Sequence, residues 1–342
     1  MMRYPELKEH STIGITPVSN GIFASAEEMF EVAFNRMEER GFKLIKNNDI
    51  WGQEKARAAT AEERAEGLMA MMLDDAIDII MPPWGGHLAV EVLEHIDFDR
   101  LQLKWLTGYS DISTLLLAIT LRTGIATAHM GNIVDLRGER MDSVTARWID
   151  VLKTKQDGSV TQHSSEKYQE EWDHEHPTEI VFNLTGQTKW KAIDAEAEPM
   201  ADVHFEGRIL GGCIDTFRHL IGTPYGDVQT FREKYTNGEK VVWYIDDSEL
   251  DTVDLKRSLM QMKYAGWFKD TAGILFSRVG KPSVKENYLY KNVYEDMARE
   301  LGVPVIYDVD FGHKPPQMTI INGAYGMIEL LEDKGRLTQY FK

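Results

Sequence analysis

Short runs of β-branched and apolar residues alternate with longer helical patterns over the first 130 residues. Residues 11–17 (STIGITP) and 42–46 have the composition of strands, and residues 76–81 form an apolar run typical of a strand buried on both faces. Residues 26–40 and 61–74 instead repeat apolar side chains at helical spacing. This alternation predicts a parallel sheet with crossover helices.

The same pattern continues to the C-terminus, with one interruption. Predicted strands occupy residues 101–108, 125–129, 241–245, 272–276 and 303–308, and predicted helices occupy 87–96, 112–122, 253–265 and 285–301. Residues 153–179 are polar and lack periodicity, which predicts a connection with a surface lobe. We therefore expect an N-terminal flavodoxin- or Rossmann-like α/β domain (1–152), a connecting segment (153–200) and a smaller C-terminal α/β domain (201–342), with a site at their interface.

One glycine-rich segment stands out in the second α/β region. Residues 205–213 contain Gly207, Gly211 and Gly212, which predicts either close backbone packing or a sharp turn. Cys213 ends this segment, and its small volume explains it better than thiol chemistry does.

Composition limits the kinds of binding partner and the cellular compartment that we expect. The 342 residues include 38 Lys and Arg against 55 Asp and Glu, a net charge of −17, which disfavours nucleic acid and anionic membrane surfaces as partners. No apolar run approaches the roughly 20 residues that span a bilayer. The single cysteine excludes an intrachain disulfide, and the N-terminus lacks an export signal, so we expect a cytoplasmic protein.

The most informative motif is the sequence TGYSDI at residues 107–112, between a predicted strand and an apolar helix. A serine at such a turn is presented beside the free N–H groups of the helix N-terminus, which suits a nucleophile, here Ser110. Alternatively, Ser110 or Asp111 merely caps the helix. Ile112 departs from the G-x-S-x-G elbow of α/β-hydrolases, so that fold is not indicated.

A second strand end carries the sequence PPWGGH at residues 82–87. Gly85 and Gly86 would let backbone N–H groups approach a ligand closely, as an oxyanion hole requires. An ordinary glycine turn explains the same residues equally well.

A serine nucleophile needs a base and a group that orients the base. His313 follows a predicted strand, with Gly312 before it and a proline pair shortly after it. Carboxylates follow another predicted strand, with Asp246 and Glu249 as the candidates. Nucleophile, acid and base thus occur in the order Ser, Asp or Glu, His, each on a loop after a strand.

Other motifs are weaker. His174 and His176 could bind a metal, but their charged surroundings favour a solvated surface. Lys281 is followed by Pro282 where a phosphate-binding loop needs Ser or Thr, and no G-x-G-x-x-G follows the first strand. We therefore expect no metal and no nucleotide cofactor.

Several of these elements together resemble the serine LD-carboxypeptidase (muramoyltetrapeptide carboxypeptidase) family, and within it the microcin C immunity branch. The resemblance rests on residues 13–17, the turn at 82–86, the Gly-Tyr-Ser-Asp sequence at 108–111, the glycine-rich segment at 207–213, and Gly312-His313. It implies a serine peptidase or amidase with a Ser-Glu-His triad at the interface of two domains, and a homodimer.

Carried over residue by residue, the resemblance implies Ser110 as nucleophile and His313 as base. Asp246 stands where the family has Glu, one methylene longer, so either Asp246 or Glu249 is the acid, and we favour Asp246. The oxyanion hole would use the N–H of Asp111 and one from the glycine turn at 85–86.

The resemblance leaves two substrate classes open. The immunity branch cleaves an amide between an aminoacyl group and a nucleotide-like moiety, whereas typical members remove a terminal D-amino acid from a peptidoglycan peptide. Trp190 resembles the aromatic residue that stacks on the nucleobase, with Trp84 as an alternative and simple packing at the domain interface as another explanation of Trp190. A binding protein disabled by the Glu-to-Asp change is the competing hypothesis, and an ester-cleaving α/β-hydrolase is a weaker one.

Overall fold

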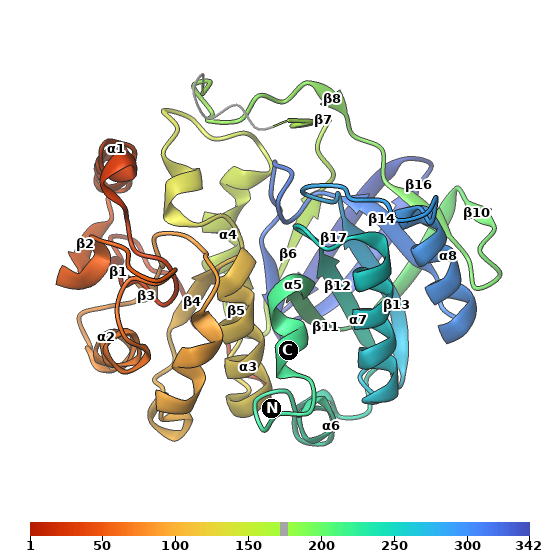
Figure 1. Cartoon of the computed structure of the whole chain (residues 1–342), viewed down its shortest axis with the longest axis horizontal. Coiled ribbons are helices and arrows are strands. Elements are labelled where there is room, and N and C mark those ends of the chain that lie inside the picture. The colour runs from red at the N-terminus through yellow and green to blue at the C-terminus, as the bar shows by residue number, and fades with distance from the viewer. Residues whose placement is uncertain (172–176) are drawn as a thin grey trace.

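Two sheets with helices on their faces make up the computed structural model, which describes residues 1–171 and 177–342 (Figure 1). The first sheet occupies the left of the view with α1 and α2, and the second lies to the right with α7 and α8. The predicted α/β class is therefore confirmed.

The first sheet has six strands in the order β15-β5-β4-β3-β1-β2. Strands β1 to β5 are parallel, and only β15 pairs antiparallel, with β5. The order 2-1-3-4-5 is that of flavodoxin-like folds, which bind ligands at the carboxyl ends of the strands. The strands are β1 (Thr12–Ile15), β2 (Lys43–Lys46), β3 (Ile79–Ile80), β4 (Trp105–Gly108), β5 (Thr127–His129) and β15 (Ile320–Asn322), with helices α1 (Glu27–Glu39), α2 (Ala61–Leu73), α3 (Ser113–Thr123) and α4 (Trp148–Leu152).

The second sheet has nine strands in the order β10-β9-β14-β13-β12-β11-β16-β17-β6. Its centre, β11 to β14, is parallel, and the flanking strands are antiparallel. The strands are β6 (Ser159–His163), β9 (Lys191–Ile193), β10 (Pro199–Met200), β11 (Asp202–Cys213), β12 (Val241–Asp246), β13 (Thr271–Ser277), β14 (Val305–Val309), β16 (Tyr325–Leu331) and β17 (Lys334–Tyr340), with helices α5 (Ile214–Phe217), α6 (Val228–Phe231), α7 (Thr252–Tyr264) and α8 (Tyr290–Leu301).

Within 153–200, residues 153–171 and 177–200 do not form a separate connecting lobe. They supply β6, β9 and β10 to the second sheet, and a small hairpin of β7 (Lys167–Tyr168) and β8 (Gly186–Gln187). This stretch of sequence is polar because its strands lie at or next to the edges of the sheet, and in β6, at one edge, buried and exposed positions alternate. The expected boundaries at 152 and 200 therefore cut through one sheet.

The glycine-rich segment at 205–213 is part of a continuous strand, β11, and not a turn. A Cβ on Gly211 would lie 1.8 Å from the carbonyl oxygen of Tyr244 on the neighbouring strand β12. Of the two expectations, close packing is confirmed and the sharp turn is wrong.

Helix α3 joins the two sheets. Its residues from Ser113 to Leu121 are all buried, because the helix contacts β5 of the first sheet and β11 of the second. An apolar pattern on every face is what such a position requires.

The chain also crosses back from one sheet to the other. Strand β14 ends at Val309 in the second sheet and β15 begins at Ile320 in the first, so the loop that carries His313 spans the junction.

Two buried glutamines hold β15 in place. Gln162 Nε2 donates to the carbonyl of Thr319 (2.8 Å), and Gln162 Oε1 accepts from the backbone N–H of Thr319 (3.0 Å). Gln339 Oε1 accepts from Ile321 N–H (2.7 Å), and Nε2 donates to the Thr319 carbonyl (2.9 Å).

Replacing Gln339 with Ala should lower the free energy of unfolding by about 2–4 kcal/mol, because the Ile321 N–H loses its partner inside the core and a void remains. Urea unfolding measures the loss. The matched control Gln261→Ala, exposed on α7, should stay within about 0.5 kcal/mol of the parent. Equal losses in the two variants would show that Gln339 does not hold β15 in place.

Candidate active site

Ser110 lies at a strained turn between β4 and α3. Its φ is +61°, a conformation that costs a residue with a side chain about 1–3 kcal/mol. Neither Ser110 nor Asp111 caps the helix: the Asp111 carboxylate instead accepts hydrogen bonds from Ser19 Oγ (2.5 Å) and from Ala89 N–H (2.8 Å). The capping alternative is therefore wrong, and the turn presents a serine as a nucleophile elbow does.

The glycine turn after β3 packs directly on Ser110. A Cβ on Gly85 would lie 2.8 Å from Ser110 Cβ and 3.2 Å from the backbone nitrogen of Asp111, so no larger residue fits there. A Cβ on Gly86 would lie 2.4 Å from side-chain atoms of Ser19 and Asn20. The structure thus brings together the three residues predicted for an oxyanion hole, Gly85, Gly86 and Asp111, beside Ser110.

Asp246 and His313 form a hydrogen-bonded pair. Asp246 is the last residue of β12 and is fully buried, and its Oδ2 lies 2.7 Å from His313 Nδ1. Asp246 Oδ1 accepts from Ser277 Oγ (2.8 Å) and from the backbone N–H of His313 (3.3 Å). The carboxylate therefore has a fixed orientation and holds the imidazole through one ring nitrogen.

Glu249, the alternative acid, lies near the same site but is paired with Lys281. Its side chain is exposed and Oε1 lies 2.7 Å from Lys281 Nζ. Gly312 explains how the shorter Asp246 reaches the histidine: φ is +81°, and a Cβ at this residue would lie 1.9 Å from Asp246 Oδ1. The loop before His313 therefore closes onto Asp246 because residue 312 has no side chain.

Each member of this pair shifts the pKa of the other in the direction that favours its charged form. Burial lowers the pKa of His313, but the charge of Asp246 and the hydrogen bond to it outweigh burial and raise that pKa above its ordinary value. Burial likewise raises the pKa of Asp246, and the neighbouring His313 outweighs burial and lowers it. A second histidine nearby, His129, is fully buried, which lowers its pKa to about 4 and keeps it neutral.

Two cavities meet at Ser110 and His313. The first, of about 340 Å³, is lined by the aromatic residues Phe23, Trp84 and Tyr109, and we call it the aromatic cavity. The second, of about 490 Å³, is lined by polar residues that include Asp215, Glu249 and Lys281, and we call it the polar cavity. Both include Gly86, Ser110 and His313 in their walls, so a substrate can extend on either side of the serine.

Trp84 is built into the wall of the aromatic cavity. Its ring lies 4.5 Å from that of Phe23 and 4.8 Å, edge-on, from that of Phe30, and its indole N–H donates to the Gly21 carbonyl (3.1 Å). These contacts leave a fixed aromatic surface next to the glycine turn.

Trp190 does not line either cavity at Ser110. It is 1% exposed in the core of the second sheet, where its indole N–H donates to Asp310 Oδ2 (2.9 Å) and its ring packs on Gly335. The predicted contact of Trp190 with a substrate therefore does not fit its position, and packing explains this residue.

Several residues of the site were missed by sequence reasoning. Ser277 ends β13, next to β12, and the rule that carboxyl ends of neighbouring parallel strands meet would have found it. Asp135 and Arg137, in the wall of the aromatic cavity, follow β5 and carry no recognisable motif. Burial raises the pKa of Asp135 to about 6, even though the charge of Arg137 acts against this shift.

Cys213, Asp246 and His313 place potential metal ligands within 4.8 Å of one another. Burial raises the pKa of the Cys213 thiol well above its ordinary value, and metals bind the thiolate, so this thiol is a poor ligand. His174 and His176 lie outside the described residues.

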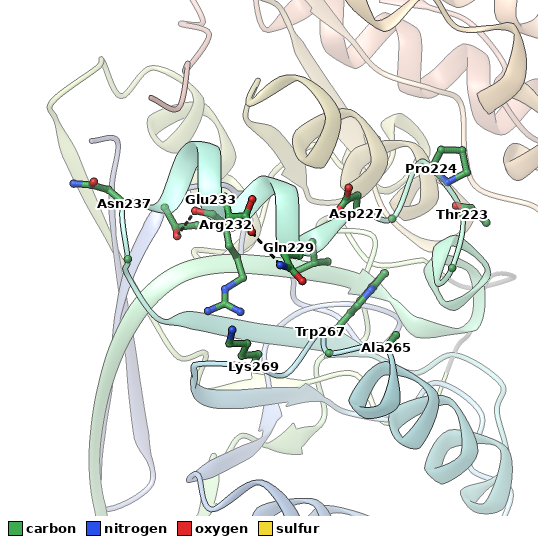
Figure 2. Close-up of a pocket in the computed structure, with 16 residues that line it drawn as sticks. Thr223, Pro224, Asp227, Gln229, Arg232, Glu233, Asn237, Ala265, Trp267 and Lys269 are labelled. Carbon is green, nitrogen blue, oxygen red and sulfur yellow. Dashed lines mark hydrogen bonds between the residues drawn. The ribbon is translucent and has the colours of Figure 1, made fainter.

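A larger cavity, of about 800 Å³, lies around α6 and the turn before β13, where residues from 222–238 and 265–269 line it (Figure 2). Figure 2 shows Gln229 and Glu233 joined by a hydrogen bond (3.0 Å) above Arg232 and Lys269. Charges of both signs line it, and it contains none of the residues predicted for catalysis.

The chain matches models of one family on both sides of the junction. Residues 13–130 match the LD-carboxypeptidase N-terminal domain and residues 206–328 match the LD-carboxypeptidase C-terminal domain. The chain belongs to the LD-carboxypeptidase family, and the predicted family is confirmed.

Individual relatives cover nearly the whole chain. A predicted carboxypeptidase of Vibrio cholerae is 25% identical over 93% of this chain and 92% of its own length. The microcin C7 self-immunity protein of Escherichia coli is 24% identical over 92% of this chain and 89% of its own length. A solved structure of the immunity protein MccF with glutamyl sulfamoyl guanosine superposes with a TM-score of 0.84 at 20% identity, covering 100% of both chains.

No described helix is long and apolar enough to cross a membrane.

Substituting Gly312 with Ala should lower the free energy of unfolding by at least about 3 kcal/mol, because the new Cβ pushes the His313 loop off the buried Asp246 carboxylate. Gly302→Ala is the matched control, since Gly302 also has a positive φ (+65°) but nothing within 4 Å of its Cβ position, and it should cost only about 1–2 kcal/mol. Chemical denaturation measures both. Equal costs would contradict the close approach.

Proposed function

We propose that the protein is a serine peptidase or amidase that hydrolyses an amide bond through an acyl-enzyme. The observation that carries the proposal is that His313, paired with the buried Asp246, lines the same two cavities as Ser110, which stands at a strained turn. Ser110 is the nucleophile, His313 the general base and Asp246 the orienting acid.

The proposed reaction has two steps. Asp246 occupies Nδ1 of His313, so Nε2 takes the proton from Ser110 Oγ as the oxygen attacks the amide carbonyl. His313 next gives this proton to the leaving amine, and the C–N bond breaks. Water, activated by the same nitrogen, then hydrolyses the ester and restores Ser110.

The oxyanion that forms in each step needs hydrogen-bond donors. The backbone N–H of Asp111, at the start of the helical segment, and one from Gly85 or Gly86 supply them. Each such donor contributes roughly 3–4 kcal/mol in the transition state. A Cβ on Gly85 would fill the space between this turn and Ser110, which supports the assignment.

An aminoacyl nucleotide amide is the substrate class that we favour. The aromatic cavity of about 340 Å³ offers Trp84 and Phe23 as flat surfaces for a nucleobase. The superposed MccF structure holds glutamyl sulfamoyl guanosine, which belongs to this class. A muropeptide with an L–D bond is the second candidate, favoured by the match to LD-carboxypeptidase domains at both ends of the chain.

Purified protein should turn over an aminoacyl sulfamoyl adenosine faster than an L–D muropeptide when the two are assayed side by side. Ser110→Ala should lower kcat by more than about 10⁴-fold, whereas the exposed Ser283→Ala should behave as the parent does. Retained turnover of both substrates by folded Ser110→Ala would exclude this nucleophile. Absence of turnover in the parent would favour the binding-protein alternative, and turnover of the muropeptide alone would favour the second substrate class.

Asp246→Asn should lower kcat by about 10⁴-fold, because the imidazole loses the partner that orients it and stabilises its positive form. The general base must be neutral, so kcat/KM of the parent falls as pH drops through the raised pKa of His313, above its ordinary 6.5. In Asp246→Asn this limb should move to lower pH. Glu249→Gln should leave the limb in place and cost far less kcat, and the opposite ranking would move the acid to Glu249.

A further inference from the structure

A third cavity, of about 500 Å³, lies on the second sheet and shares no lining residue with the two cavities at Ser110. Its walls are unusual in composition. They carry five cationic residues, Lys189, Lys191, Arg278, Lys291 and Lys314, and four tyrosines, Tyr168, Tyr290, Tyr294 and Tyr307. We call it the tyrosine–lysine cavity.

This cavity is rich in positive charge, although the chain as a whole is negative. One acidic residue, Asp308, faces five cations there, whereas the whole chain has a net charge of −17. Lys191 pairs with Asp308 (2.7 Å) and Lys291 with Glu295 (3.2 Å), but Lys189 has no ion-pair partner within residues 1–171 and 177–342. The cavity therefore keeps positive charge in excess, which attracts anions.

Arg278 is a rigid part of the wall. It is 6% exposed, and its Nη1 lies 2.9 Å from Asp310 Oδ1. Its guanidinium carbon lies 4.3 Å from the centre of the Tyr168 ring. Asp310 is itself held by the indole of Trp190 (2.9 Å), so the buried tryptophan helps to fix this arginine. A side chain ordered before a ligand arrives loses little entropy on binding.

The tyrosines add flat surfaces next to the cations. The rings of Tyr294 and Tyr307 lie 5.3 Å apart, and Lys191 Nζ lies 5.6 Å from the centre of the Tyr307 ring. Burial raises the pKa of Tyr307, so the ring stays uncharged at neutral pH. A wall of this kind suits a ligand that combines an aromatic ring with negative charge.

The position of the cavity in the fold also favours an anionic ligand. The cavity lies where β13 and β14 end, at residues 278 and 308, and beside the first residues of α8, Tyr290 and Lys291. Ligands of open α/β sheets bind outside the carboxyl ends of the strands, and the N-terminus of a helix as long as α8 favours anions.

We propose that the tyrosine–lysine cavity is a second binding site that takes a nucleotide, with its phosphates on the cations and its base against the tyrosines. The site is separate from the nucleophile, so its occupation does not depend on the proposed hydrolysis. A cavity of about 500 Å³ is within the size range of small-molecule sites.

Titration calorimetry of the full chain carrying Ser110→Ala, with ADP as the probe, tests this site without interference from turnover. ADP should bind at least about tenfold more tightly than adenosine or pyrophosphate, because each of these lacks half of the recognised groups. Absence of ADP binding at millimolar concentration, or pyrophosphate binding as tightly as ADP, would overturn the proposal.

Charge reversal locates the site. The exposed pair Lys189→Glu and Lys291→Glu should weaken ADP binding by at least about tenfold, whereas Lys55→Glu with Lys153→Glu, which changes the net charge equally at exposed residues outside this cavity, should not. Any ADP that enters the aromatic cavity is a separate binding event, which Trp84→Ala should remove while the event that depends on Lys189 and Lys291 stays. Equal losses in both charge-reversed proteins, or loss of all ADP binding in Trp84→Ala, would place the ADP elsewhere and refute the second site.

Discussion

The buried pair of Asp246 and His313 is the interaction on which the rest of the site depends. A carboxylate that is fully removed from water is tolerated only when its oxygens are hydrogen-bonded and its charge is compensated. Here the imidazole, the Ser277 hydroxyl and a backbone N–H do this, and Gly312 lets the loop come close enough. The pair therefore fixes the ring of His313, which is the base in the proposed mechanism, before any substrate arrives.

The proposed mechanism needs the pair near the serine, and Ser110 and His313 line the same two cavities because the fold joins its two sheets. Ser110 follows β4 of the first sheet, and Asp246 ends β12 of the second. Helix α3 is buried between the sheets, and the chain that carries His313 runs from β14 in one sheet to β15 in the other. The strained turn at Ser110 is in turn fixed by hydrogen bonds to the Asp111 carboxylate. The contacts that stabilise the junction between the sheets therefore also set the geometry of the site.

The loops of the site could be predicted from the sequence because each follows a strand, and the apolar pattern of a strand is visible in a short stretch of sequence. The turn at Ser110, the glycine turn at 85–86, and the loops at 246 and 313 all lie at strand ends, and the structure brings them together. The sequence did not decide between Asp246 and Glu249, because the choice depends on how closely the Gly312 loop approaches. Nor did it reveal the short strands β9 and β10 and the edge strand β6, which lie in a polar stretch of sequence, or the burial of Trp190.

Covalent labelling of Ser110 tests the central claim most directly, because it reports on the activated nucleophile without any assumption about the substrate. The purified protein is treated with a fluorophosphonate, digested and analysed by peptide mass spectrometry. The account predicts one adduct, on the peptide that contains Ser110, and its loss in folded Asp246→Asn and His313→Ala variants. An adduct on another residue, or no adduct on the folded parent, would contradict it.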